Sequence, residues 1–467
     1  MPGHQMLCPG RDGSNLEGKE RAGALWLKVV LGVSISLSVT LAVMWLAGCR
    51  SISPPAISPS PTPTGHGIAP EPSLTAPTLP TPTPTVPAVI TLTVWTAPDY
   101  SPQAEGPAGE VMRQLLATFN ETQPDIKLQY VLKKSQGKGG LLDYLLTASS
   151  VAPSVLPDVI LLEPHALRDA ARAELVQPLD NLLSPSLQED LFPFALAAGR
   201  FDGQLKGIQF QTDMTHLLYN TNKLESPPLT WTDVLTRPEA RYLFPAGGQS
   251  GLAADSFLIH YLSTGAPLFG EIGQLALDEE AMTAVLSYYA AGIQSGVVPT
   301  SVLELESTLD AWPIYLEAEA AMTEIAASHY LANRDMLRTT SYAAIPGPAG
   351  PAPTVSQGWT VAVVTKDPYR IGAAARFVEW WLSTENNANW NLAVGTLPVR
   401  RSAYQRLGEK DPYFAFLAGL LETAQPYPLA PVYREVAAAW QLAAEAVLSG
   451  EQTPEEAAAQ VMATLGQ

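Results

Sequence analysis

Ile90-Thr-Leu-Thr-Val-Trp95 alternates apolar with hydroxyl residues and contains β-branched side chains, a pattern typical of a strand. Apolar residues at helical spacing follow over 109–120, and a second strand pattern covers 126–132. A helix pattern over 140–149 then precedes a short apolar strand, Asp158-Val-Ile-Leu-Leu162. This β-α-β-α-β order predicts an α/β fold built on a mostly parallel, doubly wound sheet.

The length of the chain around this stretch indicates more than one lobe. Roughly 380 residues run from Val89 to Gln467, which is too many for a single small core, so we expect two lobes. In doubly wound sheets, ligands gather at the carboxyl ends of the strands. The loops after Trp95 and Leu162 are therefore the first candidates for a binding site.

Later segments carry clear helix signals. Thr230-Trp-Thr-Asp233 and Thr453-Pro-Glu-Glu456 each place a hydroxyl side chain three residues before an acid, which predicts capping boxes. The second also has a proline in its first turn. Another helix is predicted over 370–382, where the helical spacing of Trp380 and Trp381 assigns both rings to the core.

The N-terminal residues have the pattern of an export signal. Basic residues precede an uncharged apolar run over 29–46, which ends in Leu46-Ala-Gly-Cys49. This ending resembles the lipobox of bacterial lipoproteins, and the resemblance implies cleavage before Cys49 and attachment of lipid to its thiol. The alternative is an uncleaved transmembrane helix, since about 18 apolar residues can span a bilayer. Both interpretations place the rest of the chain outside the cytoplasm and tether it to a membrane.

Residues 50–88 have the composition of a disordered linker rich in proline, threonine and serine. Twelve prolines lie between Ser51 and Pro87, with Glu71 as the one charged residue. Proline supplies no amide donor and few large apolar groups accompany it, so this stretch cannot form a packed core. An extended spacer of about 3.1 Å per residue is the expected structure.

Cysteine usage and net charge exclude several classes of function. Cys8 leaves with the leader and Cys49 carries the lipid, so no thiol remains for a disulfide, a thiolate zinc site or a cysteine nucleophile. The six histidines show no pair at metal-ligand spacing. A formal net charge of −18 argues against nucleic acid, whose binding needs clustered lysine and arginine. We therefore expect no metal, no cofactor and no nucleic-acid partner.

A series of short motifs runs through the chain from residue 89 onward. In order, they are Phe119-Asn120, Pro124-Asp-Ile-Lys127, Leu156-Pro-Asp-Val159, Ala173-Glu-Leu-Val-Gln-Pro-Leu-Asp180, Phe201-Asp-Gly-Gln-Leu-Lys-Gly-Ile-Gln-Phe210, Leu217-Leu-Tyr-Asn220, Thr230-Trp231, Glu319-Ala-Ala-Met322, Pro346-Gly-Pro348, Gln357-Gly-Trp359 and Leu397-Pro-Val-Arg400. Together they resemble the extracellular solute-binding proteins of ABC importers, in the family-1 branch of maltose- and oligosaccharide-binding proteins. The chain departs from that pattern at Gln357, where a second glycine is common, and at His329-Tyr330, near a usual tryptophan.

The resemblance implies a monomer of the periplasmic binding protein type II fold, with two doubly wound lobes joined by hinge crossings. It assigns residues 89–211 and 357–394 to lobe 1, and residues 212–355 and 395–467 to lobe 2. A ligand between the lobes contacts both only when they close, so its higher affinity for the closed form drives a hinge motion. The resemblance also implies that ABC permease subunits in the membrane recognise the closed form and receive the solute.

The expected solute is a carbohydrate. Aromatic faces cover the C–H patches of a sugar ring, while amide, carboxylate and guanidinium groups pair its hydroxyls. By this chemistry and by the resemblance, the candidate ligand-binding residues are Trp95, Tyr100, Glu163, Asp213, Tyr330, Gln357, Gly358, Trp359 and Arg400.

Some of these residues also fit a structural role. Trp95 at a strand end suits packing as well as ligand contact, and Asp213 suits the capping of a turn. By contrast, Trp231 at a helix start and Tyr219 in an apolar run are assigned to the core.

Other ligands and functions stay open on sequence alone. Arg400 and Lys206 suit an anionic ligand such as a glycerol phosphate. Glu163 and Asp213 suit the carboxylate pair of a lipid-anchored enzyme acting on glycans. However, the domain contains no G-x-S-x-G elbow, zinc helix motif or Gly-rich phosphate loop. A structural or adhesive lipoprotein, or a ligand sensor without a transport role, is a further alternative.

Overall fold

The computed structural model describes residues 89–249, 251, 253–270 and 273–467, which belong to the second of two units, Thr83–Gln467. The predicted signal segment, the lipidation site at Cys49, the alternative membrane span over 29–46 and the linker over 50–88 lie outside the described residues. Within the described part, no helix combines the length and apolarity needed to cross a membrane.

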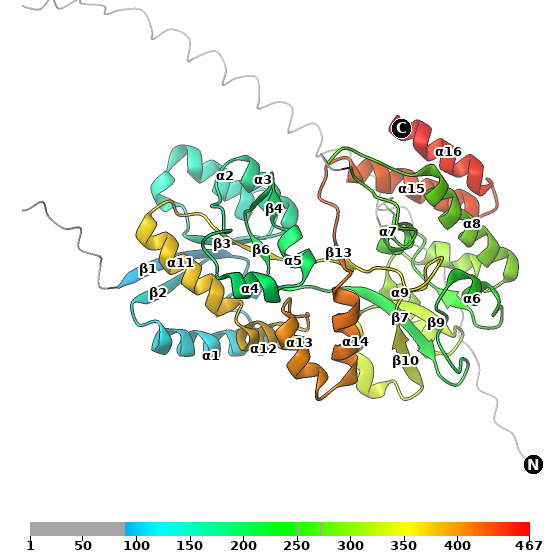
Figure 1. Cartoon of the computed structure of the whole chain (residues 1–467), viewed down its shortest axis with the longest axis horizontal. Coiled ribbons are helices and arrows are strands. Elements are labelled where there is room, and N and C mark those ends of the chain that lie inside the picture. The colour runs from blue at the N-terminus through cyan, green and yellow to red at the C-terminus, as the bar shows by residue number, and fades with distance from the viewer. Residues whose placement is uncertain (1–88, 250, 252, 271–272) are drawn as a thin grey trace, which may run out of the picture. The chain divides into compact units, whose positions relative to one another are not determined.

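The first lobe is built on a five-stranded sheet with strand order β2-β1-β3-β12-β6 (Figure 1). Its strands are β1 (Ile90–Thr96), β2 (Ile126–Leu132), β3 (Val159–Leu162), β6 (Ile208–Gln209) and β12 (Thr360–Val363). The surrounding elements are η1 (Pro98–Tyr100), α1 (Gly106–Thr122), α2 (Leu141–Val151), η2 (Pro153–Val155), α3 (Pro164–Arg172), α4 (Pro185–Asp190), α5 (Pro193–Ala197), β4 (Arg200–Phe201), β5 (Gln204–Leu205), α11 (Pro368–Trp381) and α12 (Thr384–Val394).

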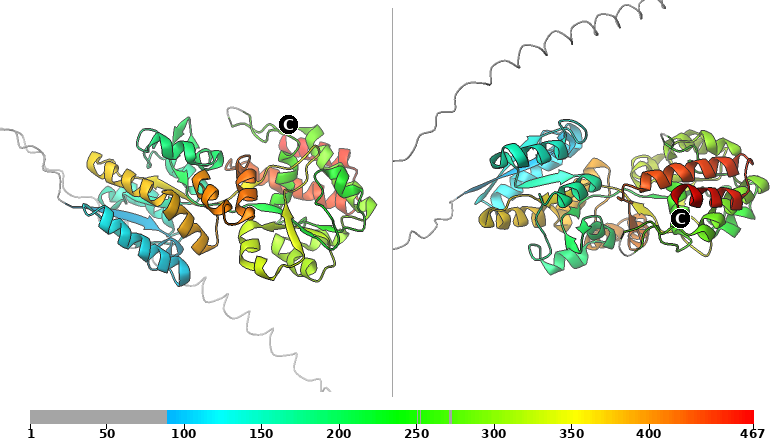
Figure 2. Two further views of the ribbon diagram at one scale, coloured as in Figure 1. Left: turned by 60° about the horizontal axis from the view of Figure 1, so that its bottom comes forward. Right: turned by 90° about the horizontal axis from the view of Figure 1, so that it is seen from above.

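The three strands that the sequence analysis singled out pair in parallel, and helices cover both faces of their sheet (Figures 1 and 2). Val159 and Leu161 pack toward α1 and α11, while Ile160 and Leu162 pack toward α2 and α3. Burial on both faces explains why β3 is a continuous apolar run. The predicted α/β, doubly wound architecture is confirmed.

One strand of this sheet runs against the others. β12 pairs antiparallel with both β3 and β6. The expectation of a mostly parallel sheet therefore holds for β1, β2 and β3 and fails at β12. The reason is connectivity, because β6 leads the chain out of the first lobe and β12 brings it back from the second.

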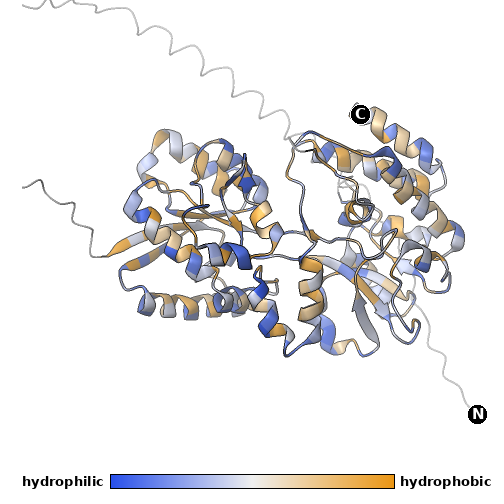
Figure 3. Ribbon diagram, in the orientation of Figure 1, coloured by the Kyte–Doolittle hydropathy of each residue, from blue (hydrophilic) through white to orange (hydrophobic). Residues whose placement is uncertain are grey.

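The second lobe is built on a four-stranded mixed sheet with strand order β10-β7-β9-β8. β7 pairs antiparallel with β10 and β9, and β8 pairs parallel with β9. Figure 3 shows that apolar and polar residues alternate along the helices and strands of this lobe. The elements are β7 (Thr215–Asn220), α6 (Trp231–Leu235), β8 (Tyr242–Leu243), α7 (Asp255–Leu262), α8 (Glu279–Ser295), η3 (Thr300–Glu304), α9 (Thr308–Leu316), β9 (Met322–Ala326), α10 (Ala327–Asn333), η4 (Arg334–Met336), β10 (Thr340–Ala343), α15 (Tyr433–Leu448) and α16 (Pro454–Leu465).

Local predictions made from caps and spacing hold. Both expected capping boxes are present, at the starts of α6 and α16. Trp231 and Tyr219 pack on the core of the second lobe, while Trp380 and Trp381 pack in the core of the first. The side chain of Trp231 also donates to the carbonyl of Pro346 at 3.0 Å.

The segment after residue 395 contacts both lobes through α13 (Arg401–Gly408) and α14 (Pro412–Leu421). Arg400 pairs with Leu191 of the first lobe. The hydroxyl of Tyr413, in α14, lies 2.8 Å from Nε2 of His216 in β7. The sequence analysis gave this whole segment to lobe 2. In the structure its first part bridges the lobes, because aromatic residues of α14 pack on the second sheet while the preceding turn is tied to the first lobe.

Candidate ligand-binding cleft

Crossing segments of the chain lie side by side between the two sheets. The amide of Thr212 donates to Leu397 O at 2.9 Å, and the amide of Asp213 donates to Gln357 O at 2.8 Å. Beside them, β11 (Val355–Ser356) pairs in parallel with β13 (Gln425–Pro426). These short backbone pairings join the lobes where the chain crosses between them, so the crossing segments have the geometry of a hinge.

The hinge packs so closely that one position requires glycine. A Cβ at Gly358 would lie 2.0 Å from the carbonyl oxygen of Gln211 and 2.8 Å from Nε2 of Gln209. That Nε2 donates to Gln211 O at 2.9 Å and to Ser356 Oγ at 2.8 Å. No larger side chain fits at residue 358 without moving these hydrogen-bonded groups.

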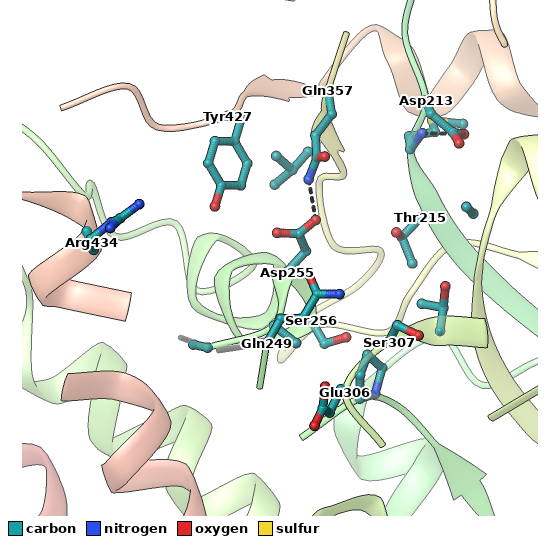
Figure 4. Close-up of a pocket in the computed structure, with 17 residues that line it drawn as sticks. Asp213, Thr215, Gln249, Asp255, Ser256, Glu306, Ser307, Gln357, Tyr427 and Arg434 are labelled. Atoms are coloured by element: carbon teal, nitrogen blue, oxygen red, sulfur yellow. Dashed lines mark hydrogen bonds between the residues drawn. The ribbon is translucent and has the colours of Figure 1, made fainter. Parts of the chain in front are cut away.

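A pocket of about 550 Å³ opens on the second-lobe side of the hinge (Figure 4). Loops before α7 and α9, the start of β7 and the crossing segments form its wall. The lining residues are Asp213, Met214, Thr215, Pro245, Gln249, Ala253, Ala254, Asp255, Ser256, Glu306, Ser307, Thr308, Ala326, Val355, Gln357, Tyr427 and Arg434.

Asp255 is the first residue of α7, and its carboxylate lies inside this pocket (Figure 4). The side-chain amide of Gln357 donates to its Oδ2, which connects a hinge crossing to the second lobe. Burial raises the pKa of Asp255 to about 6, although the hydrogen bond from Gln357 acts in the opposite direction. None of the ion pairs among the described residues involves Asp255.

A buried network of polar side chains holds the first turns of α7 in place. Ser256 and Tyr242 donate hydrogen bonds to the two carboxylate oxygens of Glu324, and Nε2 of His260 lies 3.7 Å from Glu324 Oε1. Burial raises the pKa of Glu324 to about 7 and lowers the pKa of His260 to about 3. Both shifts disfavour the charged forms, so the network holds α7 in place with little buried charge.

A smaller pocket, of about 260 Å³, opens on the first-lobe side. The half-buried Trp359 forms part of its wall, and its ring packs 4.6 Å from the ring of Tyr100. Tyr100 thus packs on the side of Trp359 that faces away from the pocket. Its hydroxyl accepts a hydrogen bond of 3.0 Å from Gln211 Nε2. The lining residues are Glu163, Pro164, His165, Ala198, Gln209, Ser356, Gln357, Gly358, Trp359, Tyr427 and Leu429.

The two pockets adjoin each other at Gln357 and Tyr427, which line both, and we refer to the pair as the cleft. One wall comes from each lobe, and the hinge segments form the floor. Rotation about the hinge therefore moves the wall with Glu163 and Trp359 relative to the wall with Asp255. This arrangement suits the capture of a small polar molecule between the lobes.

Five of the predicted site residues line this cleft: Glu163, Asp213, Gln357, Gly358 and Trp359. Glu163 accepts two hydrogen bonds from Gln136 Nε2, at 2.7 and 2.6 Å, which orient its carboxylate.

Asp213 also has a structural role. Its Oδ1 accepts from the amides of Met214 at 2.9 Å and Ser328 at 3.1 Å, and its Oδ2 accepts from the Ser328 hydroxyl. Burial raises the pKa of this carboxyl. It therefore ties the first crossing to α10, as its alternative interpretation as a cap suggested.

Four other predicted residues lie outside both pockets, and one of them, Tyr100, packs against Trp359 as described above. The Trp95 side chain is buried against α2 and α3, because the last residues of β1 are covered on both faces. Tyr330 is buried in the core, where its ring packs 4.6 Å from that of Tyr413. Arg400 forms an ion pair of 2.6 Å with Asp190. These assignments are corrected here, since each side chain is already occupied by protein contacts.

Of the polar residues that line the larger pocket, sequence reasoning predicted only Asp213 and Gln357, and it missed Asp255, Glu306, Tyr427 and Arg434 among others. They lie in segments without a motif, and a single acid at a helix start is an ordinary first-turn signal. Lys206, proposed with Arg400 as an anion contact, does not line either pocket. Among the described residues, no cluster of three or more His, Cys, Asp or Glu side chains is placed to hold a metal ion.

Solved structures of similar fold include proteins that are described as sugar-binding. The cyclic alpha-maltosyl-1,6-maltose binding protein from Arthrobacter globiformis has 18% identity and a TM-score of 0.67, over 81% of this chain and 98% of its own. An extracellular solute-binding protein family 1 member from Alicyclobacillus acidocaldarius has 20% identity and a TM-score of 0.64, with 82% and 98% covered. The sugar-binding protein MalE from Xanthomonas citri has 19% identity and a TM-score of 0.63, with 81% and 98% covered. At these identities the likeness concerns the fold.

The family itself follows from the sequence match. A family model described as bacterial extracellular solute-binding protein matches residues 114–415, which include the crossings at residues 212, 357 and 397 and most of both lobes. Members of this family are extracytoplasmic binding proteins rather than enzymes. The chain belongs to the bacterial extracellular solute-binding proteins.

Proposed function

We propose that this protein captures a carbohydrate in the cleft and delivers it to the permease subunits of an ABC importer. The observation that carries the proposal is the pairing of polar and aromatic groups around Gln357 and Tyr427. Carboxylates and amides pair with sugar hydroxyls, while the face of Trp359 suits the C–H surface of a sugar ring. The structural neighbours that bind maltose or cyclic maltosyl-maltose support the same class of ligand.

The mechanism we propose is closure of the two walls around the solute. The larger pocket, with Asp255, offers the first contacts, and the wall with Glu163 and Trp359 closes over the bound ring. The ligand favours the closed form because only that form presents both walls. The crossing segments at residues 212 and 357 are the place where this rotation would occur.

The charge of the cleft disfavours the anionic alternative. Arg434 is the only lysine or arginine among the described residues that line the two pockets, whereas four lining residues are carboxylates. A glycerol phosphate would face Asp213, Asp255, Glu306 and Glu163 with one cation to offset them. A neutral or positively charged solute fits this wall better.

The proposal includes a lipid anchor and excludes turnover. We assign Cys49 as the lipidated residue and residues 50–88 as the tether that leaves the receptor free to reach the permease. Glu163 and Asp213 line different pockets, and the Asp213 oxygens are engaged by Ser328 and Met214. The pair therefore lacks the facing arrangement that glycoside hydrolysis needs.

A ligand screen by thermal shift tests this function. The full chain, in a detergent without a sugar headgroup, is melted with mono- and oligosaccharides and with glycerol phosphates. A solute that binds only the folded state stabilises it by RT ln(1 + [L]/Kd), about 2.7 kcal/mol at a hundredfold excess over Kd. Stabilisation by a carbohydrate supports the proposal. Stabilisation by glycerol phosphates alone, or by none of the solutes, contradicts it.

Trp359→Ala then separates ligand contact from packing. We expect the shift caused by the hit to disappear, while the ligand-free protein still melts cooperatively. Trp380→Ala is the matched control, because this ring is also half-buried but lies on α11, outside both pockets. If the control loses the ligand-induced increase in Tm, or if Trp359→Ala retains it, the assignment of Trp359 as a ligand contact is wrong.

A further inference from the structure

Several hydrogen-bond acceptors in the cleft receive no hydrogen bond from the described residues, and Arg434 is the only charged donor of the lysine or arginine type that lines it. Gln209 is 1% exposed, and its Nε2 is held by Gln211 O and Ser356 Oγ. Because a carbonyl oxygen can only accept, the orientation of this amide is set, and Oε1 is the atom left for the smaller pocket. Among the described residues, none donates a hydrogen bond to this Oε1.

The larger pocket repeats this pattern with charged groups. Gln357 binds Oδ2 of Asp255, and no described residue donates to its Oδ1. The carboxylate of Glu306, in the same wall, likewise receives no hydrogen bond from the described residues. When a site closes and water leaves, a polar group that forms no new hydrogen bond destabilises the closed form.

Closure of the cleft increases this excess of acceptors and negative charges over donors and positive charges. The wall with Glu163 moves toward the wall with Asp255 and Glu306, so like charges approach while water is expelled. Arg434 is exposed at the rim and offers one positive charge. A neutral sugar supplies hydroxyl donors but leaves this repulsion in place.

We propose that the solute is a saccharide bearing a protonated amine, which Asp255 and the free oxygen of Gln209 bind across the cleft. An ammonium group has three donors, no acceptor and one positive charge. It therefore matches free acceptors and offsets the carboxylates in a single group. The inference rests on the proposed function and narrows its ligand class to amino sugars.

The test compares two trisaccharides that differ in one functional group per ring. Cellotriose and fully deacetylated chitotriose share the β-1,4 linkage and the ring shape, and the amine replaces the hydroxyl at C2. We expect calorimetry on the full chain, at a pH where the amines are protonated, to show about tenfold tighter binding of deacetylated chitotriose. Raising the ionic strength should weaken binding of the amine and leave cellotriose unchanged.

Asp255→Asn tests the assigned residue, because it keeps the shape of the side chain and removes its charge. The variant should lose the preference for the amine while retaining the affinity for cellotriose. Glu409→Gln removes the same charge at an exposed position outside both pockets and should retain the preference.

The outcomes separate this inference from the proposed function. Equal binding of the two trisaccharides, tighter cellotriose binding, or a preference that survives Asp255→Asn overturns the amine inference and leaves carbohydrate capture intact. Absence of binding by both trisaccharides overturns the inference as well. The carbohydrate panel described above then decides separately whether the broader function fails.

Discussion

Replacing Gly358 by alanine should destabilise the protein by about 2–4 kcal/mol. The added Cβ would lie 2.0 Å from Gln211 O, a backbone atom, so the crossing segment has to move by about an ångström. Overpacking of this kind costs about 1–3 kcal/mol, and loss of the hydrogen bond from Gln209 to Gln211 costs about 1 kcal/mol more. The damage begins at the hinge, because the atoms nearest to the added Cβ belong to the crossing residues Gln211 and Gln209.

A calorimetric melt measures this cost. At about 2.1 cal/mol/K per residue over roughly 380 residues, the entropy of unfolding is about 0.8 kcal/mol/K, so the expected decrease in Tm is about 3–5 °C. Scattering with a bound solute should also show incomplete closure. An unchanged Tm together with normal closure would refute the assignment of residue 358 as a tightly packed hinge position.

Gly372→Ala is the matched control for this substitution. Gly372 lies in α11, and a Cβ there meets no heavy atom within 4 Å. Alanine in a helix interior is favoured over glycine by about 0.5–1 kcal/mol, so the control should melt slightly higher than the wild type. A decrease of Tm in both variants would point to a general intolerance of added methyl groups.

Two other predictions concern buried charges. Burial raises the pKa of Glu324 from its ordinary value of 4.5 to about 7, so between these pH values the folded state keeps a proton that the unfolded state has lost. The free energy of unfolding of the wild type relative to Glu324→Gln should therefore fall as pH rises from 4.5 to 7; urea titrations that show a constant difference would contradict this. Arg370→Met should lower the free energy of unfolding by about 2 kcal/mol, because it leaves the buried Asp158 carboxylate without its cation. The value is moderate because part of the arginine side chain is exposed to solvent. Chemical unfolding checks this value, and a loss below about 0.5 kcal/mol would indicate that solvent replaces the ion pair.

The aromatic candidates show why site residues were harder to predict than elements. Trp95 is the penultimate residue of β1 and Trp359 directly precedes β12, so sequence patterns place both rings at strand ends of the first sheet. One ring is covered by α2 and α3, whereas the other borders the smaller pocket. Tyr330 follows β9 as expected for a cleft residue, yet Tyr413 packs against its ring. The covering residues lie far away in the chain, so local patterns do not report them.

The pocket itself depends on pairs that are distant in sequence. Asp255 and Gln357 are 102 positions apart and meet because the second crossing passes beside the start of α7. Tyr427 reaches the same place through the short pairing of β13 with β11. Gln357 belongs to a recognised motif, but the segments of Asp255 and Tyr427 do not, and only the crossing geometry brings the three together.

The amino-acid sequence alone determined the α/β class, the order of the first strands and helices, the capping boxes and the family, because these depend on periodicity and on motifs within short windows. The tertiary structure decided the antiparallel return of β12, the bridging role of the segment after residue 395 and the identity of the residues that face the cleft. The physical reason is that exposure to a cleft is a property of packing between segments. It depends on which side chains cover a residue, and those side chains come from parts of the chain that no local pattern connects.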